Sequence, residues 1–213
     1  MNLVSPDIER YTASHCEEEG MLFQEIRHFT ESLPLARMLS GHLVGRFLKM
    51  LVQISGSKRA LEIGTFTGYS ALAIAEGLPQ DGHLVTVDID AAMSETAQQF
   101  FSKAAWGKKI TRAVGDAKSV VAGLPGPFDF VFLDGAKEDY WPITELLLDK
   151  MPVGGLIVAD NTLWSGRVLD PYPSDADTIG ITHFNRQVKA HPNIEGVLLT
   201  VRDGLHIVRK KAS

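Results

Sequence analysis

The spacing of hydrophobic positions changes near residue 59 of this chain. Before that point the pattern is helical, with one apolar stripe formed by Leu43, Phe47, Leu48, Leu51 and Val52. An earlier helix is expected to begin after Ser5, because Pro6 suits the first helical position. Residues 1–55 are therefore predicted to form a helical segment that precedes the rest of the fold.

From Arg59 onward, short apolar runs alternate with helical stretches, notably Ala91–Lys103 and Trp141–Lys150. The runs that predict strands are Ala60–Ile63, Leu84–Val87, Ile110–Val114, Phe128–Leu133 and Leu156–Ala159. Continuous apolar runs of this length are typical of parallel strands that are buried on both faces. The pattern therefore predicts an α/β fold with a mostly parallel sheet.

The C-terminal end breaks this alternation. Val197–Arg202 and Leu205–Arg209 flank Asp203-Gly204, a dipeptide typical of two-residue hairpin turns. We therefore expect the sheet to end in an antiparallel strand. No repeat or linker-like segment divides the sequence, so residues 1–213 are expected to form one domain.

Charge and composition make several kinds of partner and site less expected. The net charge of −5 gives no electrostatic reason to expect nucleic acid or an anionic membrane surface as a partner. The single cysteine, Cys16, excludes an intrachain disulfide and a cysteine-rich zinc site. No apolar run is long enough to cross a bilayer, and no secretory signal pattern is present, so a cytoplasmic protein is expected.

The segment Leu61–Ser70 combines a strand end, two glycines and the start of a helix. Gly64 and Gly68 are four residues apart with Phe66 between them, whereas dinucleotide-binding proteins carry a further glycine where the backbone approaches the pyrophosphate. Glu62 would repel a phosphate and suits a positively charged ligand. S-adenosylmethionine has a sulfonium, an ammonium and no phosphate, so the motif favours methyl transfer over nicotinamide-dependent oxidoreduction.

Polar residues also lie at the ends of the next strands, where open α/β sheets bind ligands. Ser70 would bind a carboxylate near a helix N-terminus, Asp88 would accept both ribose hydroxyls, and Asp116 would meet an adenine edge. Simpler interpretations remain open. Gly64 and Gly68 would then only shape a turn, and Asp116 would only cap the following helix.

Two further polar clusters follow the later strands. Asp134 follows one strand, and Asp160 and Asn161 follow the next, so three oxygen ligands are expected on neighbouring loops. Oxygen donors without His or Cys suit a hard cation such as Mg²⁺ or Ca²⁺ and argue against zinc. Each cluster also has a simpler interpretation, with Asp134 as a helix cap and Asp160-Asn161 as a polar turn.

With these residues the chain resembles the cation-dependent O-methyltransferases, the family of the caffeoyl-CoA and catechol O-methyltransferases, and most of all their small bacterial members. The resemblance runs from about Met38 to the C-terminus and is most specific in Leu61–Ser70, Phe130–Tyr140 and Asp160–Trp164. It implies a doubly wound, Rossmann-like sheet of about seven strands, the last one antiparallel. It also implies a homodimer.

The resemblance implies roles for individual residues. Lys137 would be the general base, and Trp164 would flank the acceptor ring, although an exposed helix lysine and a core tryptophan are the simpler alternatives. Tyr172 lies in a loop that would cover the acceptor or merely connect two elements. Asp134, Asp160 and Asn161 would bind Mg²⁺ or another divalent cation such as Ca²⁺ or Mn²⁺. S-adenosylmethionine would be held by Met38, Glu62, Gly64, Phe66, Ser70, Asp88, Asp116, Ala117 and Asp134.

The predicted reaction is methylation of one hydroxyl of a small catechol-type acceptor. Plant members of the family carry an acidic residue in place of Ala136 and usually Gln in place of Arg46, and the animal enzyme's Trp is also absent at Ala136. These departures concern acceptor recognition. One alternative is a hydroxylated uridine in tRNA, against which the acidic net charge counts. Another is a cofactor-binding protein without catalysis, which the complete metal and Lys137 set argues against.

Overall fold

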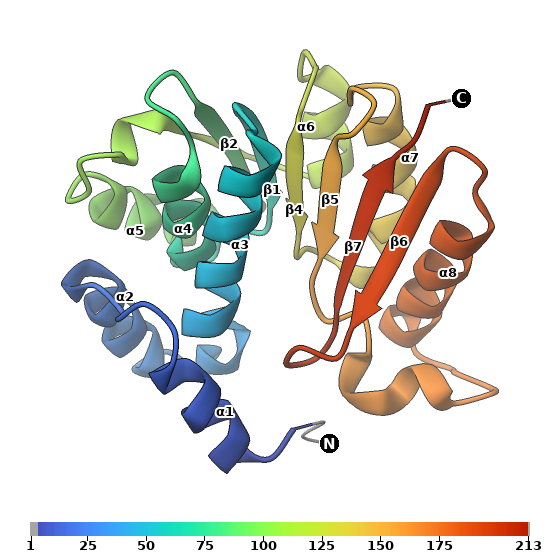
Figure 1. Ribbon diagram of the computed structural model, residues 1–213, viewed down its shortest axis with the longest axis horizontal. Helices are drawn as coiled ribbons and strands as arrows, with labels where there is room; N and C mark the ends of the chain where they lie inside the picture. The colour runs from blue at the N-terminus through green and yellow to red at the C-terminus, as the bar shows by residue number, and fades with distance from the viewer. Residues whose placement is uncertain (1–3, 213) are drawn as a thin grey trace. The chain divides into compact units, whose positions relative to one another are not determined.

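The computed structural model describes residues 4–212. They group into two compact units, one from Asp7 to Asp116 and the other made of residues 117–212 together with residues 4–6. Helices flank the strands in each unit (Figure 1). The expectation that the whole chain forms one domain stays a prediction.

Helices precede the strands of the first unit, as the apolar spacing predicts. They are α1 (Pro6–Ser14), α2 (Met21–Glu31), the short η1 (Ala36–Met38) and α3 (Gly41–Ser55). The core-facing row of α3 consists of Val44, Leu48 and Val52, which are spaced four residues apart. The predicted stripe is therefore right at Leu48 and Val52, whereas Leu43, Phe47 and Leu51 are only half-buried.

Three parallel strands follow in this unit: β1 (Arg59–Ile63), β2 (His83–Asp88) and β3 (Ile110–Val114). They are joined by α4 (Tyr69–Gly77), α5 (Ala91–Phe101) and the short η2 (Gly107–Lys109). Ile63 pairs with Val87, and Asp88 pairs with Val114, so the C-terminal ends of the three strands lie at one edge. The predicted strands and their parallel pairing are confirmed.

Two glycines allow α3 to pack closely along α4. A Cβ atom on Gly45 would lie 2.9 Å from the Tyr69 ring, and one on Gly77 would lie 2.7 Å from the backbone oxygen of Lys49. All of α4 is buried except Glu76. The first turn of α4, which follows the glycine-containing segment, is therefore held firmly inside the unit.

The second unit contains β4 (Phe130–Leu133), β5 (Leu156–Ala159), β6 (Ile194–Leu199) and β7 (Leu205–Lys210). β4 and β5 are parallel, and β7 lies antiparallel between β5 and β6 (Figure 1). The helical elements are α6 (Ala117–Gly123), η3 (Lys137–Asp139), α7 (Tyr140–Leu148), η4 (Trp164–Leu169) and α8 (Ala176–Ala190). The predicted α/β class, mostly parallel with an antiparallel C-terminal strand, is confirmed.

The connection between β6 and β7 differs from the prediction. Asp203-Gly204 indicates a two-residue turn, but Leu199 pairs with Leu205, so residues 200–204 form a longer loop. The backbone carbonyls of Asp203 and Gly204 accept hydrogen bonds from the N–H groups of Leu163 and Thr162. The dipeptide therefore binds a neighbouring loop instead of closing the hairpin, and the predicted turn type is wrong.

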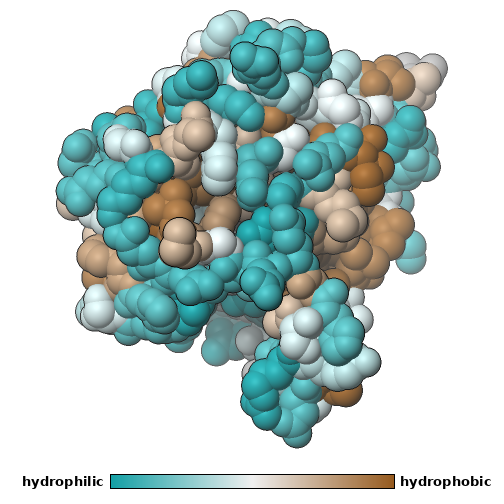
Figure 2. Space-filling model, turned by 60° about the vertical axis from the view of Figure 1, so that its left-hand side comes forward, coloured by the Kyte–Doolittle hydropathy of each residue, from teal (hydrophilic) through white to brown (hydrophobic). Residues whose placement is uncertain are grey.

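One face of the protein carries both hydrophilic and hydrophobic residues. On the face drawn in Figure 2, hydrophilic residues predominate and hydrophobic residues form separate patches. No helix within residues 4–212 is both long enough and apolar enough to span a membrane.

Candidate active site

The turn after β1 is held by the carboxylate of Asp88. Its Oδ2 accepts hydrogen bonds from the backbone N–H groups of Thr65 (2.9 Å) and Phe66 (2.8 Å). Phe66 has a φ of +48°, which is uncommon for a residue other than glycine, and the flanking Gly64 and Gly68 have φ of +94° and +89°. Two amides of the turn are thus bound to an anionic group of the protein itself. This supports the expectation of a ligand without phosphate.

The second carboxylate oxygen of Asp88, Oδ1, accepts fewer of these backbone hydrogen bonds than Oδ2. Oδ1 accepts a hydrogen bond of 2.9 Å from the backbone N–H of Asp90, and the side chain is half-buried. A carboxylate oxygen has capacity for more than one hydrogen bond. Binding of ribose hydroxyls by Asp88 is therefore compatible with its structural role, and it stays a prediction.

Glu62 is fully buried in β1 and is oriented by threonine hydroxyls. Thr86 Oγ1 donates a hydrogen bond to Glu62 Oε2, and Thr65 Oγ1 lies within hydrogen-bond distance of Thr86 Oγ1. A hydroxyl has one proton, and that of Thr86 goes to Glu62, so Thr65 is the donor to Thr86. Contact of Glu62 with a cationic group of the cofactor stays a prediction.

The other predicted cofactor residues differ in exposure. Ser70, in the first turn of α4, is buried, whereas Asp116, which follows β3, is exposed. Ala117, the first residue of α6, is half-buried. Met38, the last residue of η1, is 50% exposed. Their contacts with a cofactor stay predictions.

Lys137 is buried at the start of η3, with 7% of its surface exposed. Its Nζ donates hydrogen bonds to Asp134 Oδ1 (2.9 Å), Asn161 Oδ1 (3.0 Å) and the Tyr140 hydroxyl (2.6 Å). An ammonium has three N–H groups, so each has an acceptor. The Nζ also lies 4.8 Å from the ring centroid of Tyr140 and 5.7 Å from that of Trp164. The simpler interpretation of Lys137 as an exposed helix lysine is wrong.

Oxygen atoms from two loops gather around this lysine. Asp160 is 2% exposed at the end of β5, and its Oδ1 accepts a hydrogen bond of 2.8 Å from the Asn161 N–H. Burial, together with the negative charge of Asp134, raises the pKa of Asp160 to about 7. Because a positive charge would relieve this effect and all the donors are oxygens, the residues fit a hard cation.

The predicted metal site depends on an amide. Within residues 4–212, no three His, Cys, Asp or Glu side chains gather in a way that could hold a metal ion. With Asp134 and Asp160 as the two predicted carboxylates, a third protein ligand at this site would have to be the amide oxygen of Asn161. Asn161 has a φ of +56°, a left-handed conformation that asparagine tolerates better than most residues.

Trp164 begins a turn with an unusual backbone. Trp164, Ser165 and Gly166 have consecutive φ values of +47°, +51° and +82°. Left-handed conformations of non-glycine residues are costly and cluster at functional sites. The Trp164 Nε1 is buried and has no hydrogen-bond partner within residues 4–212. The predicted acceptor contacts of Trp164 and of Tyr172, which is 88% exposed in the following loop, stay predictions.

The sequence patterns did not identify the residues that support this loop and Lys137. Asp203 binds the loop twice, through its carbonyl to the Leu163 N–H and through its Oδ1 to the Ser165 N–H. The only indication for Tyr140 is its position three residues after Lys137 at a helix start. The sequence indicates only a turn at Asp203, because Leu163 and Ser165, which it binds, are distant in the sequence.

Residues 13–211 match the sequence model of the O-methyltransferase family. The chain belongs to this family. The caffeoyl-CoA O-methyltransferase of Petroselinum crispum is 36% identical to this O-methyltransferase over 208 residues, which cover 91% of this chain and 85% of that protein. Tricin synthase 1 of Oryza sativa subsp. japonica is 36% identical over 207 residues, which cover 90% and 82%.

A solved structure shows the same fold. The O-methyltransferase TomG from Streptomyces achromogenes, in complex with S-adenosylmethionine, has a TM-score of 0.88 and 26% identity to this chain, and the match covers 97% of this chain and 96% of TomG. The protein is therefore an S-adenosylmethionine-dependent O-methyltransferase of the caffeoyl-CoA O-methyltransferase type, with a Rossmann-like fold. The predicted methyl transfer is confirmed.

Proposed function

We propose that this O-methyltransferase methylates one hydroxyl of a small aromatic acceptor with two adjacent hydroxyls, and that it requires a divalent cation. The observation that carries this proposal is the burial of Lys137 against oxygen atoms of Asp134 and Asn161. These hydrogen bonds place a basic side chain beside two expected ligands of a hard cation. The caffeoyl-CoA relative supports the acceptor class, because a caffeoyl group carries two adjacent ring hydroxyls.

Methyl transfer to a phenolic oxygen needs a strong nucleophile. A phenol has a pKa of about 10 and is mostly protonated at neutral pH. In the proposed reaction, Lys137 acts in its neutral form, which has two N–H groups and one lone pair, and the lone pair accepts the proton of the acceptor hydroxyl. The new O–CH₃ bond forms as the S–CH₃ bond breaks, which yields S-adenosylhomocysteine and the methylated acceptor. Lys137 then releases the proton to solvent.

The cation would be held by Asp134, Asp160 and Asn161. When bound, Mg²⁺, Ca²⁺ or Mn²⁺ would lower the pKa of the acceptor hydroxyls and orient them. The oxygen-only donor set and the raised pKa of Asp160 support such a site.

Cofactor and acceptor would be held by the residues predicted for them. Asp88 would bind the ribose hydroxyls, Ser70 the carboxylate and Asp116 the adenine of S-adenosylmethionine. Glu62 would face a cationic group of the same molecule. The ring of Trp164 would flank the acceptor ring, a role that its position near Lys137 supports.

The direct test is methyl transfer from labelled S-adenosylmethionine to a panel of catechols, with Mg²⁺ and with EDTA. We expect transfer with Mg²⁺, loss of transfer in EDTA and recovery when excess Mg²⁺ is added. Equal transfer in EDTA would contradict the role of the cation. If S-adenosylmethionine binds but no catechol is methylated, the acceptor class is wrong, and a hydroxylated uridine in tRNA becomes the next substrate to test.

The role of Lys137 is tested in the same assay. Lys137→Ala should reduce kcat by roughly 10²–10⁴-fold, the usual effect of losing a general base. The affinity for S-adenosylmethionine, measured by calorimetry, should stay nearly unchanged. Lys58→Ala, which removes an exposed lysine paired with Asp81, is the control and should keep full activity. Normal turnover in Lys137→Ala would remove Lys137 as the base.

A further inference from the structure

We infer that Tyr140 is the positioning residue that fixes the Nζ of Lys137 in the active site. The inference deepens the proposed function and rests on it, because it assumes that Lys137 exchanges a proton with the acceptor. Tyr140 opens α7 and is fully buried, and its hydroxyl lies 2.6 Å from the Lys137 Nζ. This is the shortest of the three hydrogen bonds that Lys137 makes.

The direction of the hydrogen bonds makes Tyr140 an acceptor toward Lys137. The Tyr140 hydroxyl lies 3.0 Å from the backbone oxygen of Asp160, which can only accept. The single hydroxyl proton of Tyr140 is therefore committed to Asp160, and a lone pair is left for the N–H of Lys137. One hydroxyl thus joins the lysine to the loop after β5.

The ring that carries this hydroxyl is held rigidly. It packs against Phe184 of α8, with ring centroids 5.5 Å apart at an interplanar angle of 89°. The Lys137 Nζ lies 4.8 Å from the centroid of the same ring. A lysine has a long flexible stem, so a fixed acceptor at the start of a helix restricts where its amino group lies.

The two other acceptors of Lys137 have a different task. Asp134 and Asn161 belong to the proposed cation ligands and reach Lys137 from loops. Tyr140 is not one of these ligands, and its hydroxyl is a neutral acceptor. It is therefore the partner of Lys137 that does not also serve the cation, and it holds the amino group at one place relative to the loop of Asp160.

The first test compares Tyr140→Phe with Thr144→Val. Tyr140→Phe deletes the hydroxyl and keeps the ring, whereas Thr144→Val deletes another buried hydroxyl of α7, one that binds the backbone oxygen of Tyr140 and not Lys137. Tyr140→Phe should reduce kcat by about 10–100-fold, as loss of a group that supports a catalytic residue usually does. KM for the catechol and the calorimetric Kd for Mn²⁺ should change less than about threefold. Thr144→Val should keep the kcat of the wild type, even if its melting temperature falls as much as that of Tyr140→Phe.

The second test does not depend on activity. In protein labelled with ¹³C-lysine, the Cε resonance of Lys137 is identified by its disappearance in Lys137→Met. Tyr140→Phe should move this resonance, and Thr144→Val should leave it in place. The wild-type sample should also show an NOE between the ε-protons of Lys137 and the Tyr140 ring, a contact that can be measured even if the variant fails to fold.

The outcomes separate the two proposals. Methyl transfer by the wild type together with normal kcat in Tyr140→Phe would overturn the inference and leave the proposed function intact. An unmoved Cε resonance or an absent NOE would overturn it as well. If the wild type methylates no catechol in the presence of cation, the proposed function fails, while the NMR measurements still decide whether Tyr140 holds Lys137.

Discussion

Single hydroxyl groups fix the glycine-containing turn from two sides. Thr67 Oγ1 lies 2.9 Å from Thr30 Oγ1, and Thr30 donates its own proton to the backbone oxygen of Ile26 in α2. Thr67 is therefore the donor to Thr30. Thr65 donates in the same way to Thr86 of β2, which orients Glu62. The position of the turn thus depends on side chains outside the glycine motif.

Thr86→Val tests this arrangement at the residue scale. Valine keeps the shape of threonine but leaves Glu62 Oε2 without its hydroxyl donor, a loss worth roughly 1–3 kcal/mol when the group is buried. We expect a lower melting temperature and an affinity for S-adenosylmethionine that is weaker by about tenfold, measured by calorimetry. Thr96→Val, which removes an exposed hydroxyl of α5, is the control. Unchanged affinity in Thr86→Val would show that the orientation of Glu62 does not depend on Thr86.

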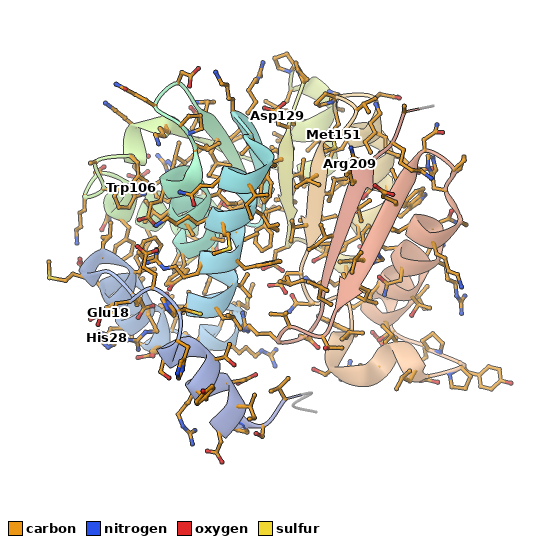
Figure 3. All side chains as sticks on the ribbon, in the orientation of Figure 1. Glu18, His28, Trp106, Asp129, Met151 and Arg209 are labelled. Atoms are coloured by element: carbon orange, nitrogen blue, oxygen red, sulfur yellow. The ribbon has the colours of Figure 1, made fainter. Side chains whose placement is uncertain are left out.

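At the scale of elements, lysines from other segments close the C-termini of three helices. The last carbonyl groups of a helix have no partner within it, and they carry partial negative charge. Lys109 Nζ binds the carbonyls of Ala75 and Leu78 at the end of α4. Lys150 Nζ binds those of Val121, Ala122 and Leu124 at the end of α6. Lys210 Nζ binds those of Leu148 and Met151 at the end of α7. Trp106, which is labelled in Figure 3, adds a hydrogen bond from its Nε1 to the carbonyl of Leu72 in α4.

Lys150→Met should destabilise the protein, because the carbonyls at the C-terminal end of α6 lose their hydrogen-bond donor. Methionine keeps much of the side-chain length and removes the ammonium that lies 2.7 Å from three backbone oxygens. We expect a loss of about 1–3 kcal/mol in the free energy of unfolding, the usual range for hydrogen bonds to a charged group. Urea denaturation measures this loss. Lys189→Met, at an exposed position in the last turn of α8, should change stability little. Equal effects in the two variants would contradict the capping role of Lys150.

At the scale of the whole molecule, a buried histidine makes stability depend on pH. His206 of β7 is 6% exposed, and its Nδ1 donates a hydrogen bond of 2.9 Å to Asn185 Oδ1. Burial lowers the pKa of His206 to about 4. Between pH 6.5 and pH 4 the unfolded chain therefore binds a proton that the folded protein does not bind. The free energy of unfolding therefore decreases as the pH is lowered from 6.5 to 4.

The expected contribution of His206 is about 2 kcal/mol between pH 7 and pH 5, since one pKa unit corresponds to about 1.4 kcal/mol. Urea denaturation at both pH values measures the fall in stability. His206→Gln removes the titrating ring. Between pH 7 and pH 5, the free energy of unfolding of this variant should therefore decrease by about 2 kcal/mol less than that of the wild type. The exposed His83→Gln is the control and should behave like the wild type. An equal fall in His206→Gln would show that other groups cause the pH dependence.

Several features of the molecule were predictable because they depend on local sequence. Buried parallel strands need continuous apolar runs, and these runs marked β1 to β5 to within a few residues. The family resemblance rested on short motifs at strand ends, and the match over residues 13–211 confirmed it. The homodimer that the resemblance implies stays a prediction.

Sequence alone thus determined the order of helices and strands, the methyltransferase family and the identity of the candidate site residues. Only the tertiary structure decided that Lys137 is buried, that its Nζ binds the Tyr140 hydroxyl and that Asp203 binds the Trp164 loop in place of closing a two-residue turn. The reason is physical. Hydrophobic spacing reports which face of one segment is buried, whereas a hydrogen bond or a burial cost depends on partners that folding brings from distant parts of the chain.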